Sequence, residues 1–366
     1  MTVCLSPNGL NEYRGDAPPT RLLVGTRNGV AVLERSGGSR WGLSERVLAG
    51  QHISSLLVEP TSGAVVAGVH WGGVFVSEDD GHTWAERTHG IGQPHVFTLR
   101  CQVLPAGGTR LFAGTEPVSL YWTADLGRTW HDLASLRDVP GQENWTFPPP
   151  PHVAHIKTAA FDPRDPEVFF VGVEQGALFK TTDGGHTWTE LKGFSNVGDP
   201  IYSDVHQIKL RPSDPDEIFM ATGAGLYHSA DRGAAWAELT GADFRIGYPD
   251  QLIFSPEDDR TLFLAGSRET PADWRHTHTA HGTVMRSRDG GHTWETCGRG
   301  IPDDLHANIE ALAVAAYSGG FALYAGTTDG EIYSSDDRGE TWVIIADGLE
   351  AVSKGGHYRN LMAAPV

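Results

Sequence analysis

Histidines recur at one position relative to a proline in distant parts of the chain. His52, His155 and His357 each precede a proline by eight residues. The residues after each histidine form a short, largely apolar run, which is typical of a β-strand. The spacing therefore predicts an imidazole at the start of several equivalent strands.

Other polar residues occupy the same place in further runs. Asp204 and Tyr248 also precede a proline by eight residues, and His206 and Asp250 lie two residues further on, on the same face of a strand. If equivalent strands start around one axis, their first side chains meet there. Imidazoles beside carboxylates are suited to a divalent transition metal. We expect ligands from this set: His52, His95, His155, His206, His306 and His357.

This arrangement predicts a metal-dependent enzyme that acts on a small or medium-sized organic substrate. One divalent ion (Fe, Cu, Zn or Mn) would serve as Lewis acid or redox centre, and carboxylates would move protons or orient the ligands. The candidate catalytic carboxylates are Glu116, Glu174, Asp204 and Asp250. A metal-free polar pocket and a purely structural lining remain open at this point, because every proposed ligand comes from a different strand.

Aromatic and basic side chains near the same expected mouth are candidates for binding a small-molecule or glycan substrate. They are Arg27, Trp71, Trp145, Tyr248, Arg268, Trp274 and Arg359. Trp145 and Trp274 fall in two insertions, at about 138–151 and 269–282, which we expect to lie on one face. Long loops on a rigid scaffold are a usual way to build a binding surface.

The elements that must position these residues come from a repeat. The pattern Ser/Thr-x-Asp-x-Gly-x-Thr-Trp occurs, with small changes, six times, and Trp41 marks a degenerate first copy. The seven tryptophans lie at 41, 84, 130, 188, 236, 294 and 342. In each copy the aspartate can accept hydrogen bonds within a hairpin turn, and the glycine supplies a positive φ. We interpret these aspartates as closing turns rather than as catalysts.

Seven copies with a period of 40–60 residues indicate a propeller. Each full repeat predicts four strands, for example His52–Val58, Ala64–Gly68, Val74–Ser77 and a short strand after Trp84. We therefore predict an all-β, seven-bladed β-propeller of four-stranded antiparallel blades over 20–366, with 1–19 as a polar leader. The run 357–365 is expected to pair with the N-terminal blade and close the ring, which would remove exposed sheet edges.

The repeated pattern resembles the BNR repeat, or Asp-box, of sialidases, xyloglucan hydrolases, sortilin-type receptors and photosystem-assembly propellers. The resemblance covers most of the chain and implies the propeller fold. It also implies two further functions. One is a glycoside hydrolase of the sialidase or Asp-box type, which would need two carboxyl groups. The other is a non-enzymatic scaffold.

Composition excludes some partners and sets the expected location. The formal net charge of −18 argues against nucleic acid and anionic membranes, which attract basic surfaces. Only three cysteines occur, widely spaced, which suggests reduced thiols. Residues 1–16 contain no apolar segment of the kind found in secretory signals. The expectation is a cytoplasmic protein, and the sequence leaves its oligomeric state open.

Overall fold

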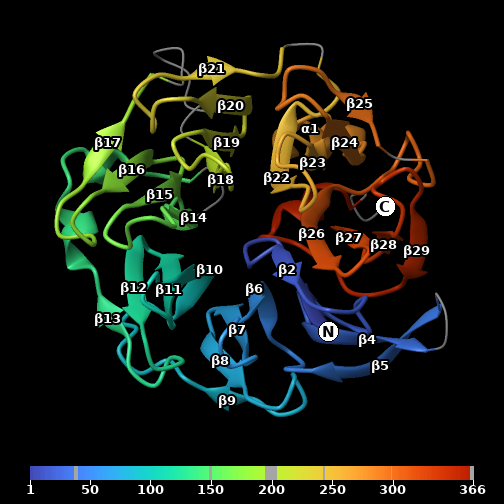
Figure 1. Cartoon of the computed structure of the whole chain (residues 1–366), viewed down its shortest axis with the longest axis horizontal. Coiled ribbons are helices and arrows are strands. Elements are labelled where there is room, and N and C mark those ends of the chain that lie inside the picture. The colour runs from blue at the N-terminus through green and yellow to red at the C-terminus, as the bar shows by residue number, and fades with distance from the viewer. Residues whose placement is uncertain (37–39, 148–150, 194–203, 242–243, 298, 363–366) are drawn as a thin grey trace. The chain divides into compact units, whose positions relative to one another are not determined.

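The computed structural model describes residues 1–36, 40–147, 151–193, 204–241, 244–297 and 299–362 (Figure 1). Its strands form seven sheets, one per repeat, as expected for a seven-bladed β-propeller, so the predicted fold class is confirmed. The chain divides into two compact units, residues 1–58 with 242–366 and residues 59–241.

The first unit contains three complete sheets and the strand β6 (His52–Val58). One sheet has the order β1 (Thr2–Leu5), β3 (Arg21–Thr26), β4 (Gly29–Ser36), β5 (Arg40–Val47). The next has the order β22 (Tyr248–Phe254), β23 (Leu262–Ser267), β24 (Thr283–Ser287), β25 (Glu295–Thr296). The third has the order β2 (Glu12–Arg14), β26 (Ile309–Tyr317), β27 (Gly320–Thr327), β28 (Ile332–Ser335), β29 (Val343–Ala346).

The second unit contains the remaining sheets. The strands that follow β6 in its sheet are β7 (Val65–His70), β8 (Gly73–Ser77) and β9 (Ala85–Glu86). Next come β10 (His95–Val103), β11 (Thr109–Glu116), β12 (Ser119–Thr123) and β13 (His131–Asp132). Then follow β14 (His155–Phe161), β15 (Phe169–Glu174), β16 (Ala177–Thr181) and β17 (Thr189–Leu191). The last sheet has β18 (Val205–Leu210), β19 (Ile218–Thr222), β20 (Gly225–Ser229) and β21 (Ala237–Glu238). Within this unit the inner strands β10, β14 and β18 are neighbours (Figure 1).

The repeated turns have the chemistry that their residue types predict. In all six copies the first Ser or Thr hydroxyl donates to the aspartate Oδ1 over 2.7–2.8 Å. The same oxygen accepts the backbone N–H four residues after the aspartate, over 2.8–3.0 Å. In the first copy Asp80 and Gly81 have φ values of 61° and 89°, the left-handed pair that a primed hairpin turn requires. These aspartates therefore hold turns.

The tryptophan that ends each turn uses its indole N–H in one of two ways. Trp130 donates to the Arg87 carbonyl and Trp342 to the Cys297 carbonyl, so each reaches the preceding repeat. Trp188 likewise reaches the Ser135 hydroxyl. The other copies bond to the glycine of their own turn, as in Trp84 to Gly81 over 3.0 Å and in Trp236 and Trp294.

The two ends of the chain differ from the prediction. Residues 1–19 are not a leader outside the fold, because β1 pairs in parallel with β3 and β2 pairs in parallel with β26. The predicted closing strand at 357–365 is instead a 3-10 helix, η4 (His357–Asn360), and 363–366 lie outside the described residues. The strand beside β3 thus comes from Val3, Cys4 and Leu5, which are buried. This apolar run is too short to stand out in the sequence.

The two insertions carry the helical segments. Around 138–151 lie the 3-10 helices η1 (Ala134–Asp138) and η2 (Gln142–Asn144). Within 269–282 lies α1 (Pro271–Thr277), which begins with a capping box formed by Thr270 and Asp273. Among the described residues, no helix is both long enough and apolar enough to cross a bilayer.

We expect Asp337→Ala to lower the free energy of unfolding by about 1–2 kcal/mol, because Asp337 accepts three hydrogen bonds within its turn. Chemical denaturation at pH 7 measures the change. Asp336→Ala is the matched control, since it removes only a surface ion pair with Arg35, which contributes less. Equal losses in the two variants would contradict the role of Asp337 in the turn.

Candidate functional site

Five inner strands have the same irregularity close to their start. The pairing with the second strand skips one residue in β10, β14, β18, β22 and β26, which is a β-bulge. The skipped residues are Phe97, Lys157, His206, Asp250 and Glu310, and all five are buried. A bulge bends its strand and re-aims the side chain there. The repeat thus places a buried, mostly polar side chain two residues after each strand-start position.

In the second unit, buried imidazoles and carboxylates alternate along a histidine–carboxylate row. Its members are His70, His95, Glu116, His155, Glu174, His206 and Asp204. The row follows from antiparallel pairing, because the first residue of an inner strand lies opposite the last residue of the second strand. His95 pairs with Glu116 in this way, and His155 pairs with Glu174.

The outer end of the row begins beside an exposed tryptophan. His70 Nδ1 and His95 Nε2 share a hydrogen bond of 2.7 Å, and His95 Nδ1 lies 3.2 Å from Glu116 Oε1. The Trp71 ring stacks on the His95 ring at a centroid distance of 3.8 Å and an angle of 28°. Trp71 itself is 69% exposed, so one end of the row reaches solvent through this indole.

The inner part of the row is closed. His155 Nδ1 lies 3.4 Å from Glu116 Oε2, and its Nε2 is hydrogen-bonded to Glu174. The Phe97 ring stacks on His155 at 3.6 Å, and His155 is 0% exposed. No substrate can therefore reach His155 directly.

The carboxyl group of Glu116 has a lowered pKa and is ionised at neutral pH. Burial alone would raise the pKa of its carboxyl group, but hydrogen bonds from His155 and His95 outweigh burial and lower the pKa to about 2. The carboxylate is consequently a base, a nucleophile or an electrostatic partner rather than a proton donor.

Beyond His155 the row ends in a group with metal-ligand geometry. One ligand atom each from Glu174, Asp204 and His206 lie within 4.8 Å of one another. Lys157 Nζ lies 3.3 Å from Glu174 Oε2, and both side chains are buried. This ammonium already balances negative charge at the position that a divalent ion would take, so the donor set is a poor fit for such an ion. The bound metal stays a prediction.

In the first unit, a buried ion pair occupies the equivalent strand positions. Lys354 Nζ is bonded to Asp250 and lies 3.4 Å from the Tyr248 hydroxyl. Asn308 Nδ2 donates to the other Asp250 oxygen over 2.7 Å. The Lys354 backbone N–H donates to Glu310. Asp250 is thus neutralised and enclosed, which does not suit the catalytic role predicted for it.

Within the second unit, the predicted histidine ligands are not assembled as one ligand set. His95, His155 and His206 lie along the row, but a carboxylate separates each from the next. His52 Nε2 lies 3.0 Å from the Ser353 carbonyl. His306 is half-exposed and pairs with Asp329 over 2.7 Å. The side chain of His357 lies outside what the structure describes.

The predicted substrate-binding residues divide into buried and exposed groups. Trp274 is fully buried against Ala280 and Leu361, where it anchors α1, and Tyr248 is 4% exposed against Lys354. Both side chains are enclosed by protein, which argues against direct contact with a substrate, and their predicted roles stay predictions.

The exposed basic candidates all belong to the first unit and have acidic or aromatic neighbours. Arg27 pairs with Glu350 over 2.5 Å, and Arg268 lies 3.5 Å from Glu269. Arg359 lies over the Tyr358 ring. In the second unit, Trp71 and Trp145 keep accessible surface.

Sequence reasoning missed three buried charges. Lys157 and Glu310 stand two residues after His155 and Asn308, which is the spacing already used for His206 and Asp250, so a signal existed. Lys354 lies in a segment without strand periodicity near the C-terminus, and no local pattern identifies it.

Comparison with known proteins gives relatives of one kind. No family model matches the chain. Xyloglucanase Xgh74A of Acetivibrio thermocellus is 25% identical over 268 residues, which cover 63% of this chain and 30% of that protein. A xyloglucanase of Hypocrea jecorina is 23% identical over 358 residues, which cover 86% of this chain and 41% of that protein. The chain thus spans less than half the length of these relatives.

Similar solved structures support the fold. An ancestral GH74 enzyme superposes with a TM-score of 0.63 at 17% identity, over 81% of this chain and 39% of that one. YCF48 from Cyanidioschyzon merolae superposes with a TM-score of 0.55 at 17% identity, over 86% of this chain and 95% of that one.

These comparisons correct the function predicted first. The curated relatives are xyloglucanases, which points to glycoside hydrolysis rather than to a metal-dependent enzyme with redox or Lewis-acid chemistry. Glycoside hydrolysis generally depends on carboxyl groups. The metal-dependent hypothesis is therefore wrong, and the alternative that the Asp-box resemblance implied agrees better with the relatives.

We expect Glu116→Gln to flatten the acid dependence of stability. A carboxyl group whose pKa is lowered from 4.5 to about 2 stabilises the fold above pH 4.5, and this contribution is lost as the pH falls toward 2. The difference in unfolding free energy between wild type and variant should shrink by about 2 kcal/mol from pH 6 to pH 3. Denaturant titrations at the two pH values measure it, and an unchanged difference would contradict the assignment.

We expect Lys354→Met to destabilise the protein by about 3–5 kcal/mol, because it leaves the buried Asp250 carboxylate without its cation. Chemical denaturation at pH 7 measures the loss. The double variant Lys354→Met with Asp250→Asn should recover much of it, since neither charge of the pair remains. A single variant within 1 kcal/mol of wild type would show that the pair is not needed.

Proposed function

We propose that the chain is the propeller of a glycoside hydrolase that acts on a xyloglucan-like glucan. The observation that carries this proposal is the similarity to xyloglucanases over 63–86% of the chain. The surface next to this row has features that suit a glycan.

Trp71 offers a platform for a sugar ring. Its indole is 69% exposed and is held from below by the His95 ring. The backbone of Trp71 has φ 61°, a conformation that bulky residues rarely adopt and that tends to persist at functional sites. Gly73, at φ 78°, completes the turn and packs against Thr88. The apolar face of a pyranose can pack on such a fixed aromatic ring.

Glu116 is the carboxylate of the row that lies closest to this platform. Its side chain is 7% exposed, against 1% for Glu174, and one imidazole separates it from Trp71. Because Glu116 is ionised, we assign it the role of the base that takes a proton from the attacking water, while a second carboxyl group protonates the leaving glycosidic oxygen. His155 and His95 hold the carboxylate in place from two sides. Glu174 and Asp204 are positioning residues behind them.

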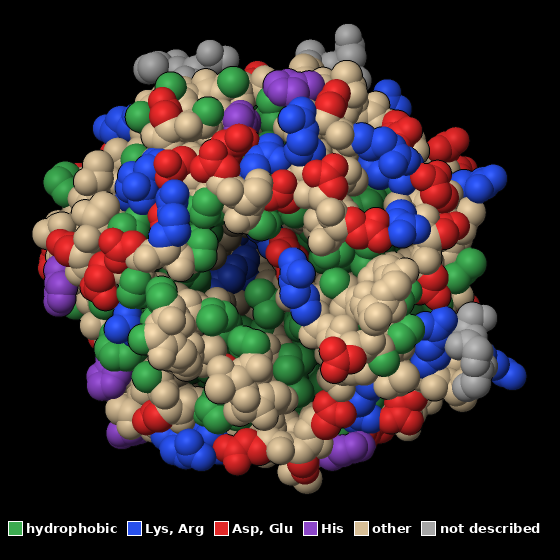
Figure 2. All heavy atoms as spheres, viewed as in Figure 1, with side chains coloured by type: hydrophobic (Ala, Val, Ile, Leu, Met, Phe, Trp, Pro, Cys, Tyr) green, Lys and Arg blue, Asp and Glu red, His purple; other side chains and the backbone are tan. Residues whose placement is uncertain are grey.

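The charge of the chain agrees with a neutral polymer. Figure 2 shows one face of the molecule, where acidic and basic side chains are interspersed. A polyanionic ligand would need a basic surface, which the net charge of −18 also disfavours.

We expect Trp71→Ala to weaken binding of xyloglucan oligosaccharides more than tenfold, because the stacking surface is lost. Glu116→Gln should abolish hydrolysis and leave binding within threefold of wild type. Isothermal titration calorimetry measures binding, and release of reducing ends measures hydrolysis. Val103→Ala is the control, since Val103 is an exposed apolar residue on β10 outside the row.

Two outcomes would overturn the proposal. If the wild type does not bind xyloglucan oligosaccharides, the proposed ligand class is wrong. If it binds them without hydrolysis, the hydrolase is wrong and a non-catalytic glycan-binding propeller remains.

A further inference from the structure

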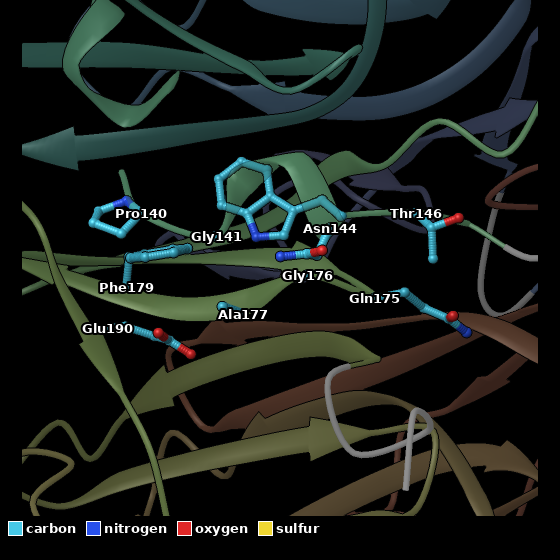
Figure 3. Close-up of a pocket in the computed structure, with 10 residues that line it drawn as sticks. Pro140, Gly141, Asn144, Thr146, Gln175, Gly176, Ala177, Phe179 and Glu190 are labelled. Carbon is cyan, nitrogen blue, oxygen red and sulfur yellow. The ribbon is translucent and has the colours of Figure 1, made fainter. Parts of the chain in front are cut away.

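We infer that a pocket beside Trp145, in the second unit of the chain, binds one neutral glycosyl unit. Ten residues line it, and η2, the β15–β16 turn and the strands β16 and β17 supply most of them (Figure 3). The cavity measures about 320 Å³, at the lower end of the range for small-molecule sites. The inference rests on the proposed function only in taking the ligand to be a sugar.

The apolar side of the pocket is an aromatic pair. The Trp145 and Phe179 rings meet edge to face, with centroids 5.6 Å apart. Phe179 belongs to the hydrophobic core of its blade, and Trp145 packs against the same cluster while remaining partly exposed. A Cβ at Gly176 would lie 2.4 Å from Val173 and 3.2 Å from the Trp145 ring. Glycine is thus needed for the indole to lie this close to the turn.

The polar side presents amide and carboxylate groups (Figure 3). Asn144 has only a long, 3.4 Å contact with Glu143, so its amide can reorient toward a ligand. Gln175 sits at φ 55° in the β15–β16 turn and lines the pocket. Glu190 pairs with the exposed Lys192 over 3.2 Å. Amides and a carboxylate can together donate to and accept from sugar hydroxyls.

Size and charge select the class of ligand. An aromatic wall with a few convergent polar groups is the usual composition of a small-molecule site. Glu190 is the one charged residue among the described residues of the lining, and Lys192 balances its charge, so the pocket suits a neutral sugar. The volume accommodates a monosaccharide rather than a long chain segment. A neutral pyranose, such as a branch of a substituted glucan, meets these conditions.

The pocket adjoins the histidine–carboxylate row without being part of it. Gln175 directly follows Glu174, so the β15–β16 turn has one residue in the row and the next in the pocket. The pocket is therefore a separate candidate sugar site in the same unit.

The test is saturation-transfer difference NMR with xylose, glucose and galactose. We expect at least one of them to give a signal with the wild type and to lose it at least fivefold in the double variant Asn144→Ala, Gln175→Ala. Gln142→Ala is the matched control, because Gln142 is an exposed neighbour on η2 outside the lining. An unchanged signal in the double variant, or none with the wild type, would overturn the inference.

A second comparison separates this inference from the proposed function. Trp71→Ala should keep the monosaccharide signal, because Trp71 does not line the pocket. If the wild type hydrolyses no glucan but the signal is still lost in the double variant, the pocket stands and the proposed function fails. If the wild type hydrolyses the glucan but the monosaccharide signal is unchanged in the double variant, the proposed function stands and the pocket inference fails.

Discussion

A β-bulge at the start of five inner strands is the constraint on which the buried polar residues depend. A regular strand alternates its side chains between two faces, whereas the bulge adds a residue and changes the direction of the next side chain. In this chain the added residue is Phe97, Lys157, His206, Asp250 or Glu310. Four of the five are ionisable, and burying them requires partners of opposite charge within reach.

The two units meet this requirement differently. In the second unit imidazoles lie between carboxylates, and Lys157 adds a cation beside Glu174. In the first unit a lysine from outside the inner strands, Lys354, enters between Asp250 and Tyr248. The same strand position thus supports an open-ended row in one unit and a closed ion pair in the other. Only the row has an end, Trp71, at the surface.

Much of the fold could be predicted because its signals are local. The Asp and Gly of each turn stand at fixed offsets, and the predicted strand His52–Val58 has the bounds that the structure gives β6. The N-terminal strand β1 could not be predicted in this way, since its pairing with β3 is long-range and parallel. The tail after Gly356 has polar and apolar residues that fit a strand as well as a turn.

The candidate site was predictable in its members but not in their connections. The sequence pattern identified His95, His155, His206 and the carboxylates as candidates. It did not indicate that a carboxylate lies between successive imidazoles. Alternation of imidazole and carboxylate, not a shared metal, emerges only when the strands are paired. Trp274 shows the converse problem, because an aromatic residue in a long loop can serve as a core anchor just as well as a ligand platform.

The unequal use of the turn tryptophans has a consequence for cooperativity. Trp130, Trp188 and Trp342 bond to the preceding repeat, whereas Trp84, Trp236 and Trp294 bond within their own turns. In an array of repeats the interface terms between neighbours decide how far a local opening spreads. Uneven interfaces divide such an array into blocks, so amide exchange should proceed block by block rather than in one step.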